Sequence, residues 1–439
     1  MGDNSKKPGI RFKGFTDDWE QRKLGDVAEF SKGSGYSKGD LVEYGTPIIL
    51  YGRLYTNYET RISDVDTFVE AKVGSVYSKG GEVIVPASGE TAEDIARAAT
   101  VDKSGILLGG DLNIVMPNKD INSSFLAISI SSGNPQRELA KKAQGKSVVH
   151  IHNEEIKNLV LPFPIKDEQN KIASYFCQLD NLITLHQRKY DKLVMSKKSM
   201  LEKMFPKNGQ TKPEIRFSGF IDDWEQRKLG ELGTITTGNT PSTSIPDYYS
   251  DDGIVWVTPT DICENITFES ARKLSDLGQQ VGRVVPKNTI LVTCIASIGK
   301  NTMLGNTGSF NQQINGLTPN ENKYDPYFLL TESALWSAKM KGSAAAGTMQ
   351  IVNRTEFSEL KTWLPSLIEQ QAIGAFFKQL DHLITLHQRK GKAAVTGCSN
   401  DANNSKGVYC KARDFGYKCY KKVKSQQIRC LIAVFIFFV

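Results

Sequence analysis

Residues 10–25 read IRFKGFTDDWEQRKLG, and residues 215–230 read IRFSGFIDDWEQRKLG, with only two differences between them. A second pair of matching segments lies almost the same distance apart in the chain: residues 182–189 and 383–390 both read LITLHQRK. The chain therefore consists of two tandem units of about 200 residues each. This period lies far above the roughly 20–50 residues of solenoid repeats, so the repeat is a duplicated domain with its connecting segment.

The two units match at their ends and diverge in their middles, at roughly residues 31–150 and 236–350. Matching ends indicate a shared scaffold, and divergent middles indicate that each unit performs a different version of one task. A duplication without functional meaning is the alternative. Some framework residues survive in the middles: Asp111, Asn113, Pro117, Asn118, Gly145, Glu155, Ile156 and Leu159 align with Gln313, Asn315, Pro319, Asn320, Gly347, Glu356, Phe357 and Leu360. We therefore expect one fold with two different surfaces.

The middles contain short β-type runs separated by Gly, Pro, Asn and Asp, followed by short helical stretches. The predicted strands are residues 46–51, 82–86, 254–257 and 289–293, and the predicted helices are residues 123–131 and 326–341. The expected fold class is α+β, with two tandem mixed α/β domains separated by long antiparallel coiled-coil helices.

The long helices are predicted from the segments that follow each middle. Residues 166–205 contain neither Pro nor Gly, and apolar side chains recur there at alternating steps of four and three, the pattern of a coiled-coil seam. The seam positions are Ile172, Phe176, Leu179, Ile183, His186, Tyr190, Leu193, Lys197, Met200 and Met204 in the first helix, and Ile373, Phe377, Leu380, Ile384 and His387 in the second. We expect the two helices to pack against each other, antiparallel, with the domains at opposite ends. His186 and His387 are interpreted as packing or register residues rather than metal ligands.

The composition is that of an ordinary globular protein, with 39% hydrophobic and 23% charged residues. The net charge of +7 lies entirely in residues 391–439, so any affinity of the body for nucleic acid must come from local patches. The seven cysteines form no CxxC pair, and we expect no metal site. Residues 1–7 are polar, unlike a signal peptide, and the apolar run 431–439 is too short to span a bilayer, so we expect a cytoplasmic protein.

Catalytic motifs are missing from the sequence. Residues 297–301 (SIGKN) lack the leading glycine and the final Ser/Thr of a phosphate-binding loop. No D/N-P-P-Y/F motif of adenine methyltransferases occurs either. The nearest match, Asp325-Pro326-Tyr327, is predicted to begin a helix, with Asp325 as its cap. We expect no catalytic residues and no cofactor on this chain.

Two variable α+β domains, each followed by a long helix, resemble the specificity subunit of Type I restriction–modification systems. The repeated DDWEQRKLG signature and the helix-entry segments 161–169 and 364–371 carry this resemblance, which covers about residues 10–390. The implied domains are a target-recognition domain at 10–163, a spacer helix at 164–206, a linker at 207–214, a second recognition domain at 215–364, a truncated spacer helix at 365–390 and an atypical basic tail at 391–439.

The resemblance implies a non-catalytic function. Each domain would read one half of a split site in double-stranded DNA. The helices would dock two modification subunits, which carry S-adenosylmethionine, and the complex would recruit restriction subunits that use ATP and Mg. No membrane partner is implied.

Candidate DNA-contacting residues are polar or basic side chains in the divergent segments, because base edges are read by such groups. In the first domain they are Arg53, Tyr55, Lys146, Ser147 and His150. In the second they are Thr258, Thr260, Asp261, Gln312, Gln313 and Arg354.

The second unit departs from the first after Lys390, where YDKLVMSKKSMLEKMF is replaced by GKAAVTGCSNDANNSK. Gly391 predicts that the second helix ends there. A reading-frame shift explains the change, and a genuine basic appendage is the alternative. Two other functions also remain open at this point: a stand-alone DNA-modifying or DNA-cleaving enzyme, and a pseudo-symmetric protein-binding scaffold.

Overall fold

The computed structural model describes residues 8–145, 148–207, 209–295, 298–344 and 351–396. The chain forms two compact units. Unit 1 is Met1–Arg188 with Gln388–Val439, and unit 2 is Lys189–His387. Each unit therefore combines one α+β domain with the start of one long helix and the end of the other, whereas the sequence-based division kept each helix whole.

Unit 1 contains two mixed sheets among the described residues. One sheet has the order β2-β12-β8-β10-β5, formed by Ala28–Lys32, Leu112–Pro117, Val83–Pro86, Ala99–Val101 and Arg61–Ile62. The other has the order β3-β6-β4-β11-β7, formed by Leu41–Val42, Phe68–Val69, Thr46–Ile49, Ser104–Leu108 and Tyr77–Lys79. The short pairs are β1 (Glu20–Lys23) with β14 (Val160–Phe163) and β9 (Ser88–Gly89) with β13 (Val149–His150). The short helices are η1 Leu24–Asp26, η2 Lys38–Asp40, α1 Arg53–Thr56, α2 Ala92–Ile95, α3 Ser123–Ile130, α4 Gly133–Lys141 and α5 Asn153–Lys157.

Unit 2 repeats the first of these sheets. Its order β16-β23-β20-β21-β18 is formed by Gly233–Thr237, Ile314–Pro319, Ile290–Thr293, Asn301–Leu304 and Ile266–Thr267. A smaller sheet has the order β19-β17-β22, formed by Lys273–Leu274, Tyr249–Val257 and Gly308–Phe310, and β15 (Glu225–Lys228) pairs with β24 (Lys361–Leu364). The helices of the domain are α7 Leu229–Leu232, η3 Pro246–Tyr248, α8 Asp276–Val281, α9 Pro326–Ala344 and α10 Arg354–Glu359. The expectation of one fold in both units is confirmed.

The strands and helices predicted from the middles are present. The four predicted strands correspond to β4, β8, β17 and β20, and the two predicted helices to α3 and α9. Asp325 caps α9 as expected, since its carboxylate accepts a hydrogen bond from the Phe328 N–H at 2.7 Å.

The DDWEQRK repeat closes each domain. In unit 1 it forms β1, which pairs antiparallel with β14, the strand directly before the long helix, with Glu20 opposite Phe163. In unit 2, β15 pairs with β24 in the same way. The tryptophan of each repeat, Trp19 or Trp224, is buried in the core of its domain. The first and last residues of each domain are thereby held together where the helix begins.

A buried ion pair fixes the start of each long helix. The Arg11 guanidinium donates two hydrogen bonds of 2.7 Å to the Glu168 carboxylate, and Arg216 makes the same two bonds with Glu369. Both carboxylates are essentially inaccessible, at 0% and 1% exposure. They lie in the first helical turn, where the helix dipole also favours a negative charge.

The glutamine after each buried glutamate connects the helix to the domain. The Gln169 amide donates to the Pro164 carbonyl at 2.9 Å and accepts from the Asn122 N–H at 2.8 Å. Gln370 makes the equivalent bonds with Pro365 and Asp325. Because Asn122 and Asp325 cap α3 and α9, this residue joins the starts of two helices.

The first long helix, α6 (Lys166–Lys203), follows the predicted seam. All ten seam positions are buried or half-buried, whereas four large apolar residues off the seam, Leu182, Leu185, Val194 and Met195, are exposed; Ala173 and Leu201, which flank seam positions, are buried and half-buried. Burial thus agrees with the alternating steps of four and three rather than with hydrophobicity alone.

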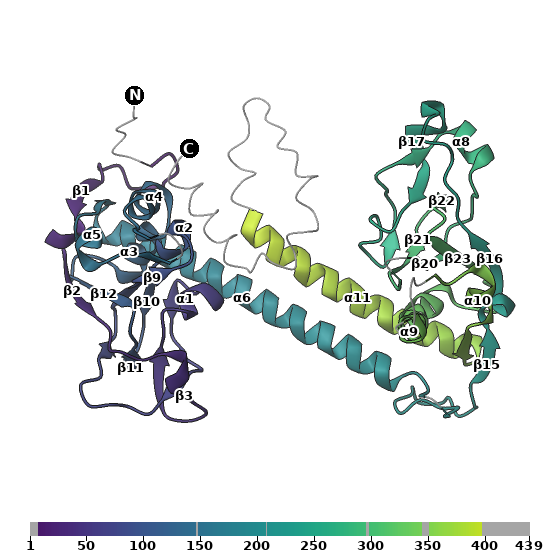
Figure 1. The fold of residues 1–439 in the computed structure, drawn as a ribbon, viewed down its shortest axis with the longest axis horizontal. Helices are drawn as coiled ribbons and strands as arrows, with labels where there is room; N and C mark the ends of the chain where they lie inside the picture. Colours follow the sequence, from purple (N-terminus) through teal and green to yellow (C-terminus); the bar gives the residue numbers. More distant parts are fainter. Residues whose placement is uncertain (1–7, 146–147, 208, 296–297, 345–350, 397–439) are drawn as a thin grey trace. The chain divides into compact units, whose positions relative to one another are not determined.

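In unit 2 the end of α6 packs against α11 (Leu367–Thr396), and the two helices run antiparallel (Figure 1). Lys197 forms an ion pair of 2.6 Å with Asp381, and eight residues later Phe205 contacts Phe377, which lies earlier in α11. The Tyr327 hydroxyl donates to the same Asp381 carboxylate at 3.0 Å. This network accounts for the one lysine on the seam.

The predicted end of the second helix at residue 390 is wrong, because α11 continues to Thr396. A single glycine in a helix interior costs only about 1 kcal/mol relative to alanine, and Lys392, Ala393 and Ala394 after Gly391 favour the helix. Residues 397–439 lie outside the described residues. Within the described part of the chain, none of the helices combines the length and the apolar character needed to cross a bilayer.

Glu332 is a buried acid within unit 2. It lies on α9, and its carboxylate accepts a hydrogen bond from the Trp363 N–H of β24 at 3.1 Å. Burial raises the pKa of this carboxyl to about 8. Glu332 is therefore largely protonated in the folded protein at neutral pH.

We expect Glu168→Gln and Glu369→Gln each to destabilise one unit, because each leaves an arginine without its charge partner. The loss should lie at the low end of about 3–5 kcal/mol, since the edge of each arginine still reaches solvent. Chemical denaturation followed by circular dichroism measures this loss. Glu154→Gln, which removes an exposed carboxylate, is the matched control and should change stability by less than about 0.5 kcal/mol. Equal effects of control and test would contradict the interpretation.

We expect the stability of unit 2 to depend on pH through Glu332. The folded state keeps a proton that the unfolded chain releases at about pH 4.3. The resulting stabilisation is fully present below the unfolded pKa and is lost as the pH rises through about 8. Thermal unfolding between pH 5 and 9 should show a falling midpoint for the wild type relative to Glu332→Gln, which cannot titrate. Parallel profiles for the two proteins would show that this carboxyl does not titrate on unfolding.

Candidate nucleic-acid interface

Several loops of unit 1 emerge from one edge of its sheets. Strands β4 and β11 run parallel, and the Gly109 N–H donates to the Ile49 carbonyl at 2.9 Å where both strands end. Strand β8 runs antiparallel to β12, with Pro86 opposite Leu112. The segments after β4, β8 and β11 therefore leave from the same edge, which we name the loop edge of unit 1.

Unit 2 has an equivalent loop edge. Strands β17 and β22 run parallel, with Val257 opposite Phe310, and the Asn311 N–H donates to the Val257 carbonyl at 3.0 Å. Thr293 at the end of β20 lies opposite Ile314 at the start of β23. The segments after β17, β20 and β22 form this loop edge.

Two framework asparagines secure one further loop at each edge. The Asn113 side chain donates to the Ile151 carbonyl at 2.9 Å, and Asn315 donates to the Val352 carbonyl at 3.2 Å. Ile151 and Val352 in turn donate their N–H groups to the carbonyl that follows β8 or β20. This shared anchoring explains why Asn113 and Asn315 persist in otherwise divergent middles.

In unit 1 the structure brings two of the predicted contact residues together. The Tyr55 hydroxyl donates to the Ser88 carbonyl at 2.6 Å, and the Ser88 hydroxyl lies 3.1 Å from Nδ1 of His150. His150 is exposed, whereas burial raises the pKa of Tyr55 well above its usual value. Tyr55 is therefore a neutral support at this edge, and His150 is the side chain presented to solvent.

Arg53 is predicted from the sequence to contact DNA, but the structure places it in ion pairs within the domain. Its guanidinium forms ion pairs of 3.0 Å with Glu59 and with Asp66, and its side chain is only 11% exposed. It holds the loop between β5 and β6 and has little charge left for a partner. Lys146 and Ser147 lie outside the described residues.

In unit 2, Asp261 shapes a turn. Its carboxylate accepts hydrogen bonds from the Thr258 N–H at 2.8 Å, the Thr258 hydroxyl at 2.6 Å and the Ala271 N–H at 2.9 Å. The Thr260 hydroxyl lies 2.8 Å from that of Thr258 and is exposed. Asp261 is a positioning residue here, and the threonines are the groups that it presents.

The other predicted residues of unit 2 differ in accessibility. Gln312 is exposed and accepts a hydrogen bond from the Thr240 hydroxyl. Gln313 is half-buried and is tied to Asn311 by bonds of 3.0 and 3.1 Å. Arg354 is exposed in the first turn of α10, next to the loop that Asn315 anchors.

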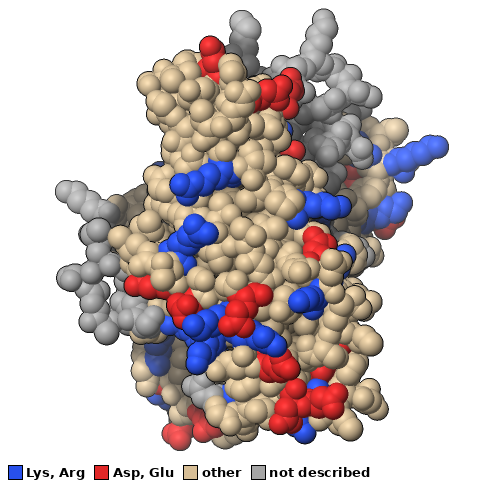
Figure 2. Space-filling model, turned by 90° about the vertical axis from the view of Figure 1, so that its right-hand side faces the viewer, with Lys and Arg blue, Asp and Glu red and all other residues tan. Residues whose placement is uncertain are grey.

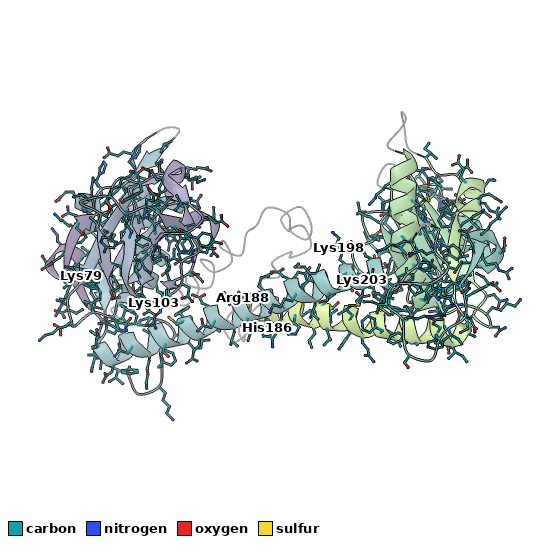
Figure 3. All side chains as sticks on the ribbon, turned by 90° about the horizontal axis from the view of Figure 1, so that it is seen from below. Lys79, Lys103, His186, Arg188, Lys198 and Lys203 are labelled. Atoms are coloured by element: carbon teal, nitrogen blue, oxygen red, sulfur yellow. The ribbon has the colours of Figure 1, made fainter. Side chains whose placement is uncertain are left out.

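Sequence reasoning missed a basic group in unit 1. Lys103, at the start of β11, pairs with Asp64 at 2.7 Å, and Arg188 comes from α6. The Lys103 ammonium, and more weakly the Arg188 guanidinium, lower the pKa of the Asp64 carboxyl, so the three groups lie close together. Lys79 on β7 is exposed near the same strand end (Figure 3). We call Lys79, Lys103 and Arg188 the basic flank; only their exposed basic character, not their proximity, is visible in the sequence.

The surface of unit 2 carries both signs of charge. Figure 2 shows Lys and Arg side chains intermixed with Asp and Glu on one of its faces, among a majority of uncharged residues. Such a surface suits recognition by hydrogen bonds from neutral side chains more than attraction by a strong field. Threonine, glutamine, histidine and arginine at the loop edges are side chains that pair with base edges in the major groove.

The chain is similar to known proteins along both units. Residues 16–195 and 221–396 match the family described as the Type I restriction modification DNA specificity domain. The putative type I restriction enzyme MjaX specificity subunit of Methanocaldococcus jannaschii is 24% identical over 400 residues, which cover 86% of this chain and 90% of that protein. The HindI specificity subunit of Haemophilus influenzae is 28% identical over 171 residues, or 37% of each chain.

A solved structure also shares the fold. The S subunit of a Type I restriction-modification system from M. genitalium superposes with a TM-score of 0.62 at 13% identity, over 89% of this chain and 96% of that one. Since the family matches twice, once over each unit, this chain belongs to the family of Type I restriction–modification DNA specificity proteins.

Proposed function

We propose that this chain is a non-catalytic DNA-specificity subunit in which each domain reads one half of a split site in duplex DNA. The observation that carries the proposal is the duplication itself. Two copies of one domain keep the same order in their first sheet and the same loop anchors, while their loop edges present different side chains. This is the arrangement expected for two DNA-reading domains that share one scaffold and recognise different sequences.

The loop edges are proposed to contact the bases. Of the predicted contact residues that the structure describes, the exposed ones are Thr260, Gln312 and Arg354 in unit 2 and His150 in unit 1. Asp261, Tyr55 and Arg53 are proposed to hold these edges in shape, because their polar atoms are already bonded within the fold.

The basic flank is proposed to contact phosphates. The basic flank lies at the start of β11, and the loop edge of unit 1 lies at its end. The five residues of this strand span about 17 Å, which is about half a turn of DNA. One duplex can therefore reach both regions. Phosphate contacts position a protein on DNA without reading sequence, which suits lysine and arginine beside a recognition edge.

The partners follow from the family. The relatives are specificity subunits by name, and we extend this role to the present chain. Modification subunits carrying S-adenosylmethionine, two per complex, would dock on α6 and α11, and restriction subunits with ATP and Mg would join them. This chain would hold no cofactor itself and would act in the cytoplasm, beside the chromosome.

Gln312→Ala is expected to change recognition in one half of the site only. A good side-chain pair with a base discriminates by about 1–3 kcal/mol, so the preference at one base pair should fall roughly tenfold or more. The measurement is an adenine-methylation map of cells that carry this gene and its cognate modification subunit. The wild type should give a split motif that disappears when the gene is deleted. Asn320→Ala, at an exposed framework position away from the loop edge, is the control. Absence of any gene-dependent motif would contradict the proposed function.

Lys103→Gln and Arg188→Gln are expected to weaken DNA binding equally for all sequences. Each lost phosphate contact should reduce the slope of log affinity against log salt by about 1. Binding of the assembled subunits to cognate and non-cognate duplexes at several salt concentrations measures both effects. Lys13→Gln is the matched control, because the second repeat has Ser218 at this position. A loss confined to the cognate duplex would show that these residues read bases instead.

A further inference from the structure

The positive side chains of unit 2 fall into two groups. Several of those on the scaffold form ion pairs; Lys228, for example, pairs with Glu359 at 2.6 Å. Arg283, Lys300 and Lys341 differ, because all three are exposed and none of them forms an ion pair with a carboxylate of the described residues. Their charges are therefore available to an anionic partner.

A backbone carbonyl holds the Lys300 side chain at the loop edge of unit 2. The ammonium group donates to the Pro259 carbonyl at 2.8 Å, and the Lys300 N–H donates to the Thr293 hydroxyl at 2.9 Å, at the end of β20. Pro259 directly precedes Thr260, one of the exposed groups proposed to read bases. A carbonyl fixes the position of an ammonium without neutralising it, so Lys300 keeps its full charge beside Thr260.

Arg283 is fixed in the same way beside Gln312. Its guanidinium donates to the Thr237 carbonyl at 2.6 Å, and its N–H donates to the Asn239 side chain at 2.8 Å. Asn239 is followed by Thr240, whose hydroxyl donates to Gln312. Gln312, another group proposed to read bases, thus also has a cation nearby that a carbonyl holds in place.

Lys341 lies over the turn that directly precedes Lys300. A Cβ atom on Gly299 would lie 3.0 Å from the Lys341 Nζ atom and 2.6 Å from its Cε atom, and Gly299 has a φ of +88°. The turn therefore requires glycine, and both lysines border it. The sequence supplies no acidic partner from the segments next to them, since residues 296–297 and 345–350 contain neither Asp nor Glu.

Unit 1 treats the cation at the position of Lys300 differently. Ala99 and Thr302 are equivalent, because each is connected by strand pairing across β8 or β20 to the residue that follows a framework asparagine. Two residues before them lie Arg97 and Lys300. The Arg97 side chain is only 8% exposed and pairs with Asp94 at 2.5 Å. The cation is thus neutralised within the fold in unit 1 and presented to solvent in unit 2.

We infer that Arg283, Lys300 and Lys341 form a phosphate-binding rim on the loop edge of unit 2. Cations that are fixed at a surface without acidic partners attract anions, and duplex DNA carries one negative charge per about 1.7 Å of its axis. This rim lies directly beside groups proposed to read bases, whereas the basic flank of unit 1 lies about half a turn of DNA from its loop edge. The inference rests on the proposed function, which makes DNA the ligand of this edge.

The test measures binding of the assembled subunits, at several salt concentrations, to duplexes that contain or lack the motif found by methylation mapping. Lys300→Gln and Lys341→Gln should each lower the slope of log affinity against log salt by about 1 with both duplexes. At about 0.1 M salt this is a roughly eightfold loss of affinity. Lys300→Arg keeps the charge and should keep the wild-type slope. Lys323→Gln is the matched control, because Lys323 is exposed beyond the end of β23 that lies away from the loop edge.

Ethylation of single phosphates, which removes their charge, gives an independent measurement. It should weaken binding at phosphates adjacent to the base pair whose preference Gln312→Ala changes. Interference confined to phosphates half a turn away from that base pair would overturn the inference.

The salt measurements separate this inference from the proposed function. Slopes of Lys300→Gln and Lys341→Gln that equal the slope of the control overturn the rim, even when the wild type prefers the motif. A loss confined to the motif duplex overturns it as well, because phosphate contacts carry no sequence information. If mapping yields no motif, the proposed function fails, and the slopes on any duplex still test the rim. Absence of binding to every duplex contradicts both.

Discussion

The bidentate contact between an arginine and a buried glutamate determines where each long helix begins and how it leaves its domain. Arg11 and Glu168 lie far apart in sequence, as do Arg216 and Glu369, so the contact closes each domain on itself. The buried carboxylate needs its arginine, because an isolated charge in the interior is costly. The adjoining glutamine then joins the long helix to α3 or α9.

The scaffold was accessible from sequence because its determinants repeat. The alternation of four and three steps predicted the buried side of α6, including the exposed positions of Leu185 and Met195. The pattern could not explain Lys197, since its partner Asp381 lies on another helix. Gly391 also led to a predicted end of the second helix that is too early, because one glycine weakens a helix without breaking it.

The candidate interface was less accessible for a physical reason. Sequence shows which side chains are polar and which segments diverge, but not which polar atoms are already bonded within the fold. Arg53 and Asp261 have the right chemistry for DNA, yet ion pairs and turn contacts occupy them. The grouping of Lys103 and Arg188 around Asp64 likewise arises only when β11 and α6 come together.

The division of the chain into units has a consequence for its synthesis. Unit 2 is formed by one continuous stretch, Lys189–His387, whereas unit 1 also includes residues from Gln388 onward. A ribosome makes the amino-terminal domain first, and domains generally fold as they emerge. Here the main core of the first domain to emerge is made of residues between Trp19 and Ala173, so it can form before the second domain is synthesised. The core of unit 2, in contrast, extends from Met204 to Leu380 of α11, so its apolar surface stays exposed until that helix has been made, and this is the stage most prone to aggregation or to capture by a chaperone.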